Sequence, residues 1–307
     1  MLAKRIATHH FNNAPKMLSP IVGKGSVNHI FLAIRDEVEI IIRLSDIGDQ
    51  DRALKFYEKE RWCIEQATAL GIPSPTVLAL DVMDERPYML QTRLRGVNGE
   101  DSALSDEAIC FTLGQYAQRI HSILLSGFGE DLTDFRRGDG LARWQRWVDY
   151  NLNSLTAHDP LIKLGVYELK QAEAICHRFF LLKTMPVTLA LTHGDLSPRN
   201  TLVDGVDGAG RIALLDWGCA EAHLAPHYDL LCLMQQDNYR EAHLHSFVAG
   251  YGFSSDEFAR VSAELDNLML LKAFDLVRWA IDRKPERIAE KVDDARRVMQ
   301  TLLLASS

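Results

Sequence analysis

The first third of the chain alternates between short apolar runs and polar turns. The apolar runs are rich in β-branched residues and are bounded by glycines or charged residues, as at the turn over residues 35–37, which is the usual signal of a β-hairpin. Residues 51–70 instead carry apolar positions at helical spacing, and Gly71 follows them as a helix stop. We therefore expect one helix between the third and fourth of five strands; the expected strands span residues 18–22, 28–34, 38–44, 76–82 and 88–92.

Beyond Gly96 the apolar positions fall mostly at helical spacing. Residues 187–220 are the exception, because their apolar runs are short enough for strands. The pattern predicts an α+β protein with a small antiparallel β-sheet lobe over residues 1–95 and a larger, mainly helical lobe over residues 96–307. In the second lobe, helices are expected over residues 105–126, 141–156, 165–183, 237–249, 256–283 and 286–304, and strands over residues 187–191, 201–203 and 211–215.

The composition is that of a globular protein. Of the 307 residues, 47% are hydrophobic and 25% are charged, and the formal net charge is −8. At about 150 residues per domain, this length suits two lobes that each contain a core. No uninterrupted apolar run exceeds five residues, whereas a membrane-spanning helix needs about twenty. We therefore expect no membrane segment.

The charge is unevenly divided along the chain. Residues 1–95 hold 13 basic and 12 acidic side chains, whereas residues 96–307 hold 21 basic and 30 acidic side chains. No cluster of basic residues is visible of the kind that a nucleic-acid-binding face needs, so we expect no nucleic-acid partner. The acidic second part has two interpretations: an ordinary solvated surface, or a surface that attracts a cationic small molecule.

Five cysteines are spread widely along the chain, and no C-x-x-C pair occurs. An odd number without regular spacing argues against a disulfide framework and against a zinc ribbon. The N-terminus starts with basic residues but does not continue into the apolar stretch of a secretory signal. The expected location is therefore a reducing cytoplasm.

Two motifs in the second lobe carry the sharpest chemical signal. The segment HGDLSPRN begins at His193, and a D-W-G triplet begins at Asp216, 16 residues after the final asparagine. Asp195 and Asn200 stand on a loop whose proline prevents a regular helix. Phosphoryl transfer needs a carboxylate that orients the acceptor, a carboxylate for Mg²⁺ and a neutral oxygen ligand. The spacing therefore predicts a phosphoryl-transfer site.

These motifs resemble those of the aminoglycoside phosphotransferase family, a branch of the protein-kinase-like superfamily. The family combines H-G-D-x-x-x-x-N with a D-W that stands in place of the kinase D-F-G. The turn around Gly25 matches the hairpin that covers the nucleotide, Arg43 takes the place of the phosphate-binding lysine, and Glu60 takes the place of the helix glutamate that pairs with it. The resemblance implies a two-lobed protein-kinase-like fold with MgATP between the lobes.

The resemblance also implies roles for the residues of the two motifs. Asp195 is expected to be the catalytic base, which orients the acceptor hydroxyl and accepts its proton. Asn200 and Asp216 are expected to bind Mg²⁺. His193 and Asp229 are expected to brace the catalytic loop and to take no part in the chemistry.

The nucleotide is expected to contact the first lobe. Backbone N–H groups of the glycine turn can approach the phosphates closely, and an arginine can hold phosphate oxygens through two N–H groups, although it is not equivalent to lysine. The backbone of the segment after the fifth strand is expected to meet the adenine edge. ATP is the expected donor, and GTP stays open. The residues with these expected contacts are Gly25, Ser26, Arg43, Glu60, Thr92 and Leu94.

The implied reaction moves the γ-phosphoryl group to a hydroxyl of a small molecule, with an aminoglycoside-like cationic compound as the expected acceptor. Helices within residues 141–183 and 256–283 are expected to form the acceptor pocket. The aromatic stripe of Trp144, Trp147 and Tyr150 falls at helical spacing, which favours core packing over a substrate wall. Four carboxylates could hold ammonium groups or could form a solvated helix face: Glu264, Asp266, Asp275 and Asp282.

Three alternative functions are compatible with these motifs. One is a kinase of another hydroxylated metabolite, such as an amino alcohol or a sugar. Another is a nucleotide-binding pseudoenzyme, against which the intact Asp195, Asn200 and Asp216 argue. A true protein kinase is disfavoured because no A-P-E segment follows Asp216 and Asp229 comes only 13 residues later. The acceptor hydroxyl and the oligomeric state stay open.

Overall fold

The computed structural model describes residues 1–21, 28–46, 48–205, 210–236 and 238–304. Its first part is a five-stranded antiparallel sheet with the strand order β1-β2-β3-β5-β4. Hairpins join β2 to β3 and β4 to β5, as the polar turns predict. The strands are β1 (Met17–Ile21), β2 (Asn28–Arg35), β3 (Val38–Ser45), β4 (Val77–Met83) and β5 (Arg86–Thr92).

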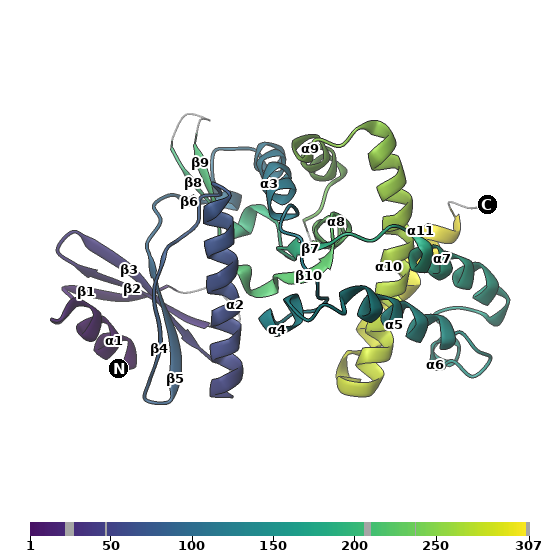
Figure 1. The fold of residues 1–307 in the computed structure, drawn as a ribbon, viewed down its shortest axis with the longest axis horizontal. Coiled ribbons are helices and arrows are strands. Elements are labelled where there is room, and N and C mark those ends of the chain that lie inside the picture. Colours follow the sequence, from purple (N-terminus) through teal and green to yellow (C-terminus); the bar gives the residue numbers. More distant parts are fainter. Residues whose placement is uncertain (22–27, 47, 206–209, 237, 305–307) are drawn as a thin grey trace.

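Helices lie on both faces of this sheet, α1 (Leu2–Phe11) on one and α2 (Gln50–Ala69) on the other (Figure 1). Successive side chains of a strand point to opposite faces, so β3 has side chains that contact each of the two helices. Ile40 and Ile42 join α1 in a small apolar core. Arg43 points to the other face and forms an ion pair with Glu60 of α2. The sheet therefore presents the buried guanidinium of Arg43 to α2.

The expectation of a single helix in the N-terminal lobe is wrong, because α1 is a second one. Its residues Ala3, Ile6 and Ala7 are fully buried, and their spacing forms one apolar stripe of a helix. The physical reason for α1 is the apolar outer face of the sheet, which would otherwise be exposed to water.

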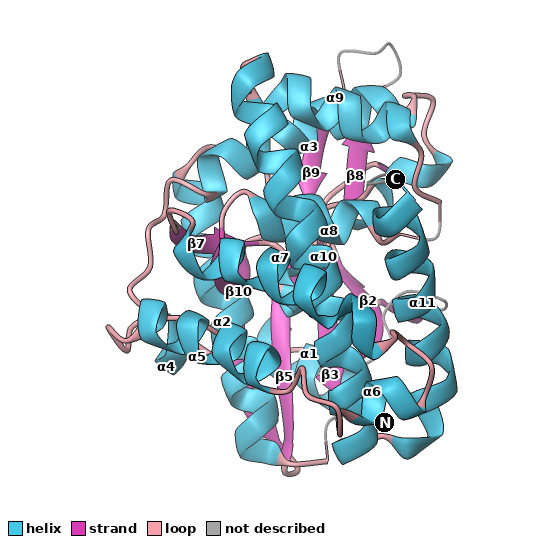
Figure 2. Ribbon diagram, turned by 90° about the vertical axis from the view of Figure 1, so that its right-hand side faces the viewer, coloured by secondary structure: helices cyan, strands magenta, loops and turns pink. Residues whose placement is uncertain are grey.

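Most of the remaining chain is helical and encloses the larger of the two apolar cores. From the helical side, helices lie in front of the strands (Figure 2). The helices are α3 (Asp106–Ile120), α4 (Leu132–Phe135), α5 (Gly140–Asn153), α6 (Pro160–Lys163), α7 (Ala172–Thr184), α8 (His227–Met234), α9 (Glu241–Tyr251), α10 (Ser255–Arg283) and α11 (Ile288–Leu304). Single 3₁₀ turns are η1 (Gly99–Asp101), η2 (Leu169–Gln171), η3 (Pro198–Asn200), η4 (Trp217–Cys219) and η5 (Pro285–Arg287).

Two short sheets hold the segments that carry the motifs. β7 (Leu189–Thr192) pairs with β10 (Glu221–Leu224). β8 (Thr201–Asp204) pairs on one side with β9 (Arg211–Leu214) and on the other with β6 (Val97–Asn98). Residues 193–200 therefore connect β7 to β8, and residues 215–220 connect β9 to β10. Both motif segments are anchored at each end by a strand.

Several boundaries differ from those predicted. The helix expected over residues 165–183 begins at Ala172, because Gly165 has a φ of 67° and Glu168 forms a capping box with Gln171. The helix expected over residues 105–126 ends at Ile120. Strand β10 and helix α8 are absent from the prediction, since each is too short for a periodic pattern. Residue 237, the expected start of the next helix, lies outside the described residues.

A buried polar network joins the helices of the second part. Arg278 of α10 donates to Asp159 at 2.6 Å and to the Asn151 side-chain oxygen at 2.7 Å. Tyr167 donates its hydroxyl to the same Asp159 carboxylate at 3.0 Å. Arg278 and Asp159 are only 5% and 0% exposed in their side chains. The network therefore connects α10 with α5 and with the N-terminus of α6 through a desolvated ion pair.

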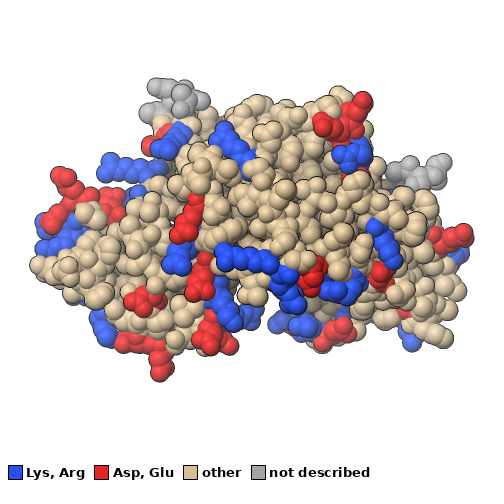
Figure 3. Space-filling model, viewed as in Figure 1, with Lys and Arg blue, Asp and Glu red and all other residues tan. Residues whose placement is uncertain are grey.

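Acidic and basic side chains are interspersed on the surface. On the face drawn in Figure 3, a group of basic side chains gathers over the region of α4 and α5. The arginines of that region alternate with aspartates that they contact, as in the pairs of Arg137 and Arg143 with Asp134. This face therefore has no continuous acidic patch. Among the described helices, none has the length and apolar character that crossing a membrane requires.

Candidate functional site

Buried hydrogen bonds fix the backbone of the segment that follows β7. The Asp229 carboxylate accepts the His193 N–H at 3.0 Å and the Gly194 N–H at 2.6 Å. It also accepts a hydrogen bond from His121 at 2.9 Å. Burial alone would raise the pKa of Asp229, but the hydrogen bonds from His121 and from the Gly194 N–H lower it, so the carboxylate stays charged. Asp229 thus has the bracing position predicted for it.

His193 links the two motif segments to each other. Its Nδ1 accepts the Asp195 N–H at 3.3 Å, which leaves Nε2 to donate to the Leu215 carbonyl at 3.0 Å. Burial lowers the pKa of His193, so the ring is neutral at neutral pH. A neutral, fully engaged imidazole orients the loop and does not carry protons.

Gly194 brings the two segments into direct contact. Its φ is 76°, and a side chain there would collide with the Cys219 carbonyl. Only glycine combines this left-handed conformation with such a close backbone approach. The glycine of the H-G-D motif therefore allows the loop with Asp195 to pack on the turn after Asp216.

Asp195 is held by an ion pair that sequence analysis did not anticipate. The Arg199 Nη2 donates to both Asp195 carboxylate oxygens, at 2.7 and 2.8 Å. The Asp195 side chain is 21% exposed and the Arg199 side chain is 51% exposed, so the pair is open to solvent. The sequence signal that could have predicted this pair is the spacing of four residues between the two opposite charges. The arginine orients the carboxylate.

Asn200 and Asp216 stand at adjacent ends of a two-stranded ladder. Thr201 pairs with Leu214, and the Leu215 N–H donates to the Asn200 carbonyl at 2.9 Å. The Asn200 Nδ2 donates to the Asp195 carbonyl at 2.9 Å, so its Oδ1 is the atom left for a ligand. The ladder therefore places the Asn200 amide beside the strand end that carries Asp216.

Asp216 has an unusual backbone conformation. Its φ is 58°, a left-handed value that costs about 1 kcal/mol or more in a residue with a side chain. Its Oδ1 has only a long contact of 3.4 Å with the Gly218 N–H. Burial raises the pKa of Cys219 to about 11, and the charges of Asp195 and Asp216 act in the same direction. Both carboxylates therefore lie near this cysteine.

Arg43 and Glu60 form the ion pair that the sequence predicts. Arg43 donates Nη2 to Glu60 Oε1 at 2.9 Å, and Nη1 contacts the other carboxylate oxygen. Glu60 is fully buried. Burial alone would lower the pKa of Arg43, but the Glu60 carboxylate raises it, and the charge of Asp216 acts in the same direction. The guanidinium therefore stays charged within electrostatic reach of Asp216.

The other residues with an expected nucleotide contact are less closely defined. Gly25 and Ser26 lie outside the described residues. Thr92 is the last residue of β5, and its hydroxyl accepts the Thr76 N–H at 2.9 Å. Leu94 is half-buried in the segment between β5 and β6. The structure therefore places Thr92 and Leu94 where β5 leads into the second part, and β5 pairs with the strand that carries Arg43.

The four candidate acceptor carboxylates do not gather in one place. Glu264 accepts hydrogen bonds from His227 at 2.7 Å and from Arg260 at 3.3 Å. Asp275 accepts one from Asn151 at 3.1 Å. A rise of about 1.5 Å per residue separates the first and last of the four by several helical turns. They therefore form no single ammonium-binding cluster. Asp266 borders a surface groove and Asp282 is exposed near the end of α10.

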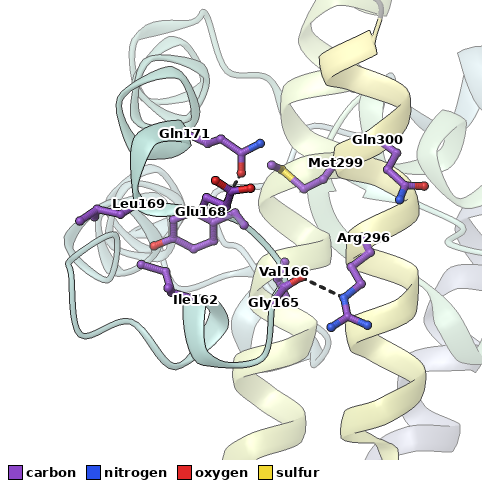
Figure 4. A pocket seen from close by; sticks show the side chains of 10 residues that line it. Ile162, Gly165, Val166, Glu168, Leu169, Gln171, Arg296, Met299 and Gln300 are labelled. Atoms are coloured by element: carbon purple, nitrogen blue, oxygen red, sulfur yellow. Dashed lines mark hydrogen bonds between the residues drawn. The ribbon is translucent and has the colours of Figure 1, made fainter.

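Two surface grooves contain no residue of the two motif segments. Figure 4 shows one of them, between α11 and the segment before α7, where Arg296 donates to the Gly165 carbonyl at 2.9 Å. Asp266 lines the second groove, but no residue of the predicted catalytic, metal or nucleotide contacts lines either of them. Within the described ranges, no cluster of three His, Cys, Asp or Glu side chains could hold a metal ion. The candidate site is instead two aspartates and one asparagine.

The packing of several other side chains is also defined. Trp144 is fully buried in the core as predicted, whereas Tyr150 is 49% exposed. His223 accepts the Leu224 N–H, and His227 pairs with Glu264, so each of these two imidazoles has a protein partner. Lys59, which sequence analysis did not single out, contacts the turn after Asp216. The sequence signal that could have identified Lys59 is its position on the apolar face of α2, where a charged residue is unusual.

Comparison with known sequences identifies the family. The sequence model described as phosphotransferase enzyme family, APH, matches residues 21–264. The curated viomycin phosphotransferase of Streptomyces vinaceus is 28% identical over 137 residues, which make up 44% of this chain and 45% of that protein. The chain therefore aligns with less than half of the length of that relative.

Solved structures share the fold over nearly the whole chain. The GDP and kanamycin complex of APH(2″)-IIIa has a TM-score of 0.66 at 15% identity and covers 98% of each chain. A ternary complex of the aminoglycoside phosphotransferase APH(4)-Ia with AMP-PNP and hygromycin B has a TM-score of 0.65 at 16% identity and covers 97% of each chain. The fold is thus the two-lobed, kinase-like one. With this fold and with the family match over most of its length, the chain belongs to the phosphotransferase enzyme family.

Proposed function

We propose that this protein transfers the γ-phosphoryl group of ATP to a hydroxyl of a cationic small molecule of the aminoglycoside kind. The observation that carries the proposal is the convergence of three side chains from separate segments. Asp195, Asn200 and Asp216 are drawn together by the His193 bonds and by the β8–β9 ladder. The buried ion pair of Arg43 with Glu60 lies within electrostatic reach of Asp216.

The donor set suits Mg²⁺. Carboxylate and amide oxygens are the ligands that this hard cation prefers. The Asn200 side chain uses its nitrogen for a hydrogen bond to the Asp195 backbone, which leaves its oxygen for a ligand, and Asp216 is exposed. Asn200 and Asp216 would hold the ion. When bound, Mg²⁺ neutralises charge on the nucleotide phosphates.

Asp195 would act on the acceptor. Its carboxylate would accept a hydrogen bond from the attacking hydroxyl and take its proton. The new oxygen–phosphorus bond would form as the bond from the γ-phosphorus to the bridging oxygen of ATP breaks, and ADP would leave. Arg199 would hold the carboxylate in that orientation. Much of the rate gain would come from positioning, as in other phosphoryl-transfer sites. Arg43 would hold phosphate oxygens of the donor while Glu60 keeps its side chain in place.

The main chain of the first lobe would complete the nucleotide site. The Thr92 carbonyl and the Leu94 N–H would meet the adenine edge, and Gly25 with Ser26 would cover the phosphates. Leu94 N–H makes no hydrogen bond to another described residue, so it is available to a base. The solved relatives hold AMP-PNP in one case and GDP in the other, which supports nucleotide use with either base.

The choice of an aminoglycoside-like acceptor rests on the relatives. The names of the similar proteins refer to viomycin, kanamycin and hygromycin B. An amino alcohol or a sugar is the second candidate acceptor class, and the arrangement of acidic side chains on α10 favours keeping it. The carboxylates of α10 do not form one cluster, since Glu264 and Asp275 are engaged in internal hydrogen bonds.

A panel of acceptors tests the proposal. Purified protein with MgATP or MgGTP is incubated with aminoglycosides, peptide antibiotics, amino alcohols and sugars, and phosphorylated products are detected by phosphorus NMR. We expect a phosphate ester on a hydroxyl of a cationic antibiotic. Turnover of amino alcohols or sugars alone would favour the second class, and no product from any acceptor would contradict the proposal.

A variant of the proposed base separates catalysis from binding. Asp195→Asn should lower kcat by about 10²- to 10⁴-fold, because the amide cannot take the proton, while affinity for the nucleotide is retained. Asp204→Asn, an exposed change at the far end of β8, is the matched control and should behave like the wild type. Equal activity of Asp195→Asn and the wild type would rule out the assigned role.

A further inference from the structure

Lys59 of α2 is buried, and among the described residues its ammonium forms no ion pair. The residue is 4% exposed, and its Nζ donates to the carbonyls of Gly218 at 2.8 Å and Ala220 at 3.0 Å. The ammonium also lies 5.3 Å from the centre of the Phe56 ring, within the range of a cation–π contact. A buried ammonium is costly unless its protons are bonded. These two carbonyls are therefore a specific anchor.

The two carbonyls belong to the turn that follows Asp216. Gly218 is part of η4, and Ala220 is its C-terminal cap, which leads into β10. The other side of this turn packs on Gly194, where no side chain fits beside the Cys219 carbonyl. The turn is therefore held between α2 and the loop that carries Asp195, and the strained backbone of Asp216 stands at its start.

The neighbour of Lys59 makes the second contact of α2. Glu60 forms an ion pair with Arg43 of β3. Lys59 donates to the turn after Asp216, where Gly218 is 159 residues further along the chain. Two consecutive side chains thus connect one helix to both charged parts of the site. A rotation or shift of α2 that breaks one of these contacts would break the other.

We propose that Lys59 is a positioning residue that couples α2 to the Asp216 turn, so that Arg43 and Asp216 keep one relative position around the nucleotide phosphates and Mg²⁺. The inference rests on the proposed function. In this arrangement Lys59 would contact neither the nucleotide nor the metal, because its ammonium is bonded to the turn. Lys59 would determine the position of the Asp216 carboxylate, so its replacement is expected to weaken the affinity for Mg²⁺.

The test compares variants of Lys59 with a control on the same helix. Lys59→Met keeps the length but removes the donors, Lys59→Arg restores them, and Lys55→Met changes an exposed lysine one turn away. Binding of AMP-PNP is measured by calorimetry without metal and over a Mg²⁺ series. Lys59→Met should need about tenfold more Mg²⁺ for half-maximal tightening, as expected for losing hydrogen bonds to a charged group, with metal-free binding within about twofold.

Hydrogen exchange supplies a readout that does not depend on the ligand. The amides of residues 216–221 should exchange faster in Lys59→Met than in the wild type, and Lys59→Arg and Lys55→Met should resemble the wild type. If Lys59→Met does not fold, Lys59→Gln is compared with Lys59→Arg in both measurements. The same differences are expected in that pair.

Two results would overturn the proposal. One is an unchanged Mg²⁺ requirement in the folded variant, and the other is an equal loss of metal-free nucleotide binding, which would indicate a general structural role. The proposed function fails in a different way. In that case the wild type itself would show no Mg²⁺-dependent nucleotide binding or no phosphorylated product.

Discussion

At the scale of single residues, the site depends on how Asp195 is oriented. A carboxylate that accepts a proton must point at one hydroxyl, and a solvent-exposed aspartate has several rotamers. Arg199 removes this freedom with two contacts of 2.7 and 2.8 Å from one nitrogen. The arginine lies on the same short loop, so the constraint moves with the loop.

Replacing Arg199 should therefore slow catalysis. Arg199→Ala is expected to lower kcat about tenfold, which corresponds to about 1.4 kcal/mol of lost positioning, and to leave nucleotide affinity unchanged. Arg199→Lys should recover only part of the loss, because an ammonium has no planar fork. Steady-state kinetics with the best acceptor of the panel measure both. Arg211→Ala, at an exposed position of β9, is the control, and an unchanged kcat in Arg199→Ala would contradict this prediction.

At the scale of elements, α10 depends on one desolvated ion pair. Arg278 joins Asp159 and Asn151 in the interior. Removing one partner of a buried pair leaves the other charge without compensation, which typically costs about 3–5 kcal/mol.

Arg278→Leu is accordingly expected to lower the free energy of unfolding by about 3–5 kcal/mol. Arg283→Leu, at an exposed position of the same helix, should change it by about 0.5 kcal/mol or less. Urea titrations followed by circular dichroism give both values. A loss in Arg278→Leu as small as that in Arg283→Leu would show that the network contributes little.

Strand β10 makes stability depend on pH. Burial lowers the pKa of His223 well below its usual value, and the charges of Lys272 and His227 act in the same direction. The folded state therefore resists protonation of the ring, whereas the unfolded state accepts the proton near pH 6.5. The stabilising contribution is present above pH 6.5 and is lost as the pH falls below it.

His223→Phe should reduce this dependence. The ring is stacked on Tyr228 with centroids 4.0 Å apart, so an aromatic replacement keeps much of the packing. Between pH 7.5 and pH 5.5 the wild type should lose about 1 kcal/mol more unfolding free energy than His223→Phe. Urea titrations at the two pH values test this. Parallel losses in both proteins would assign the pH dependence to other groups.

At the scale of the whole molecule, the candidate site is assembled from two parts of the chain that are far apart in sequence. Arg43 and Glu60 come from the first part, and Asp195 and Asp216 come from the second. The boundary near residue 95 stays a proposal. α2 contributes Cys63 and nearby side chains to the larger core, so the sheet and the helical part meet across this helix.

A ligand that contacts both parts should stabilise the whole chain. AMP-PNP with Mg²⁺ at about 100 times its Kd should add about 2.7 kcal/mol to the free energy of unfolding, which raises Tm by several degrees. Asp216→Asn should abolish the increment due to Mg²⁺ and keep the metal-free increment, while Asp204→Asn should respond as the wild type does. Thermal unfolding with and without Mg²⁺ measures the increments, and an intact Mg²⁺ increment in Asp216→Asn would argue against its role as a ligand.

Much of the fold could be predicted because its signals are local. The hairpins of the first sheet and the long helices α2, α10 and α11 follow from periodicity, and the Arg43–Glu60 pair followed from the order of elements and the family resemblance. Short elements were missed, as with β10 and α8, since four to eight residues contain too little periodicity. Helix α1 was missed although Ala3, Ile6 and Ala7 show its stripe.

By itself, the sequence determined the two-part order of elements, the spacing of the H-G-D and D-W-G motifs and hence the class of chemistry. The tertiary structure alone decided which side chains meet. Asp229 reaches the His193 amide across 36 residues, and Lys59 reaches the Gly218 carbonyl across 159. Such contacts depend on how whole elements pack. A buried charge or amide without a partner is costly, so each of these groups bonds to a partner that the packing brings close.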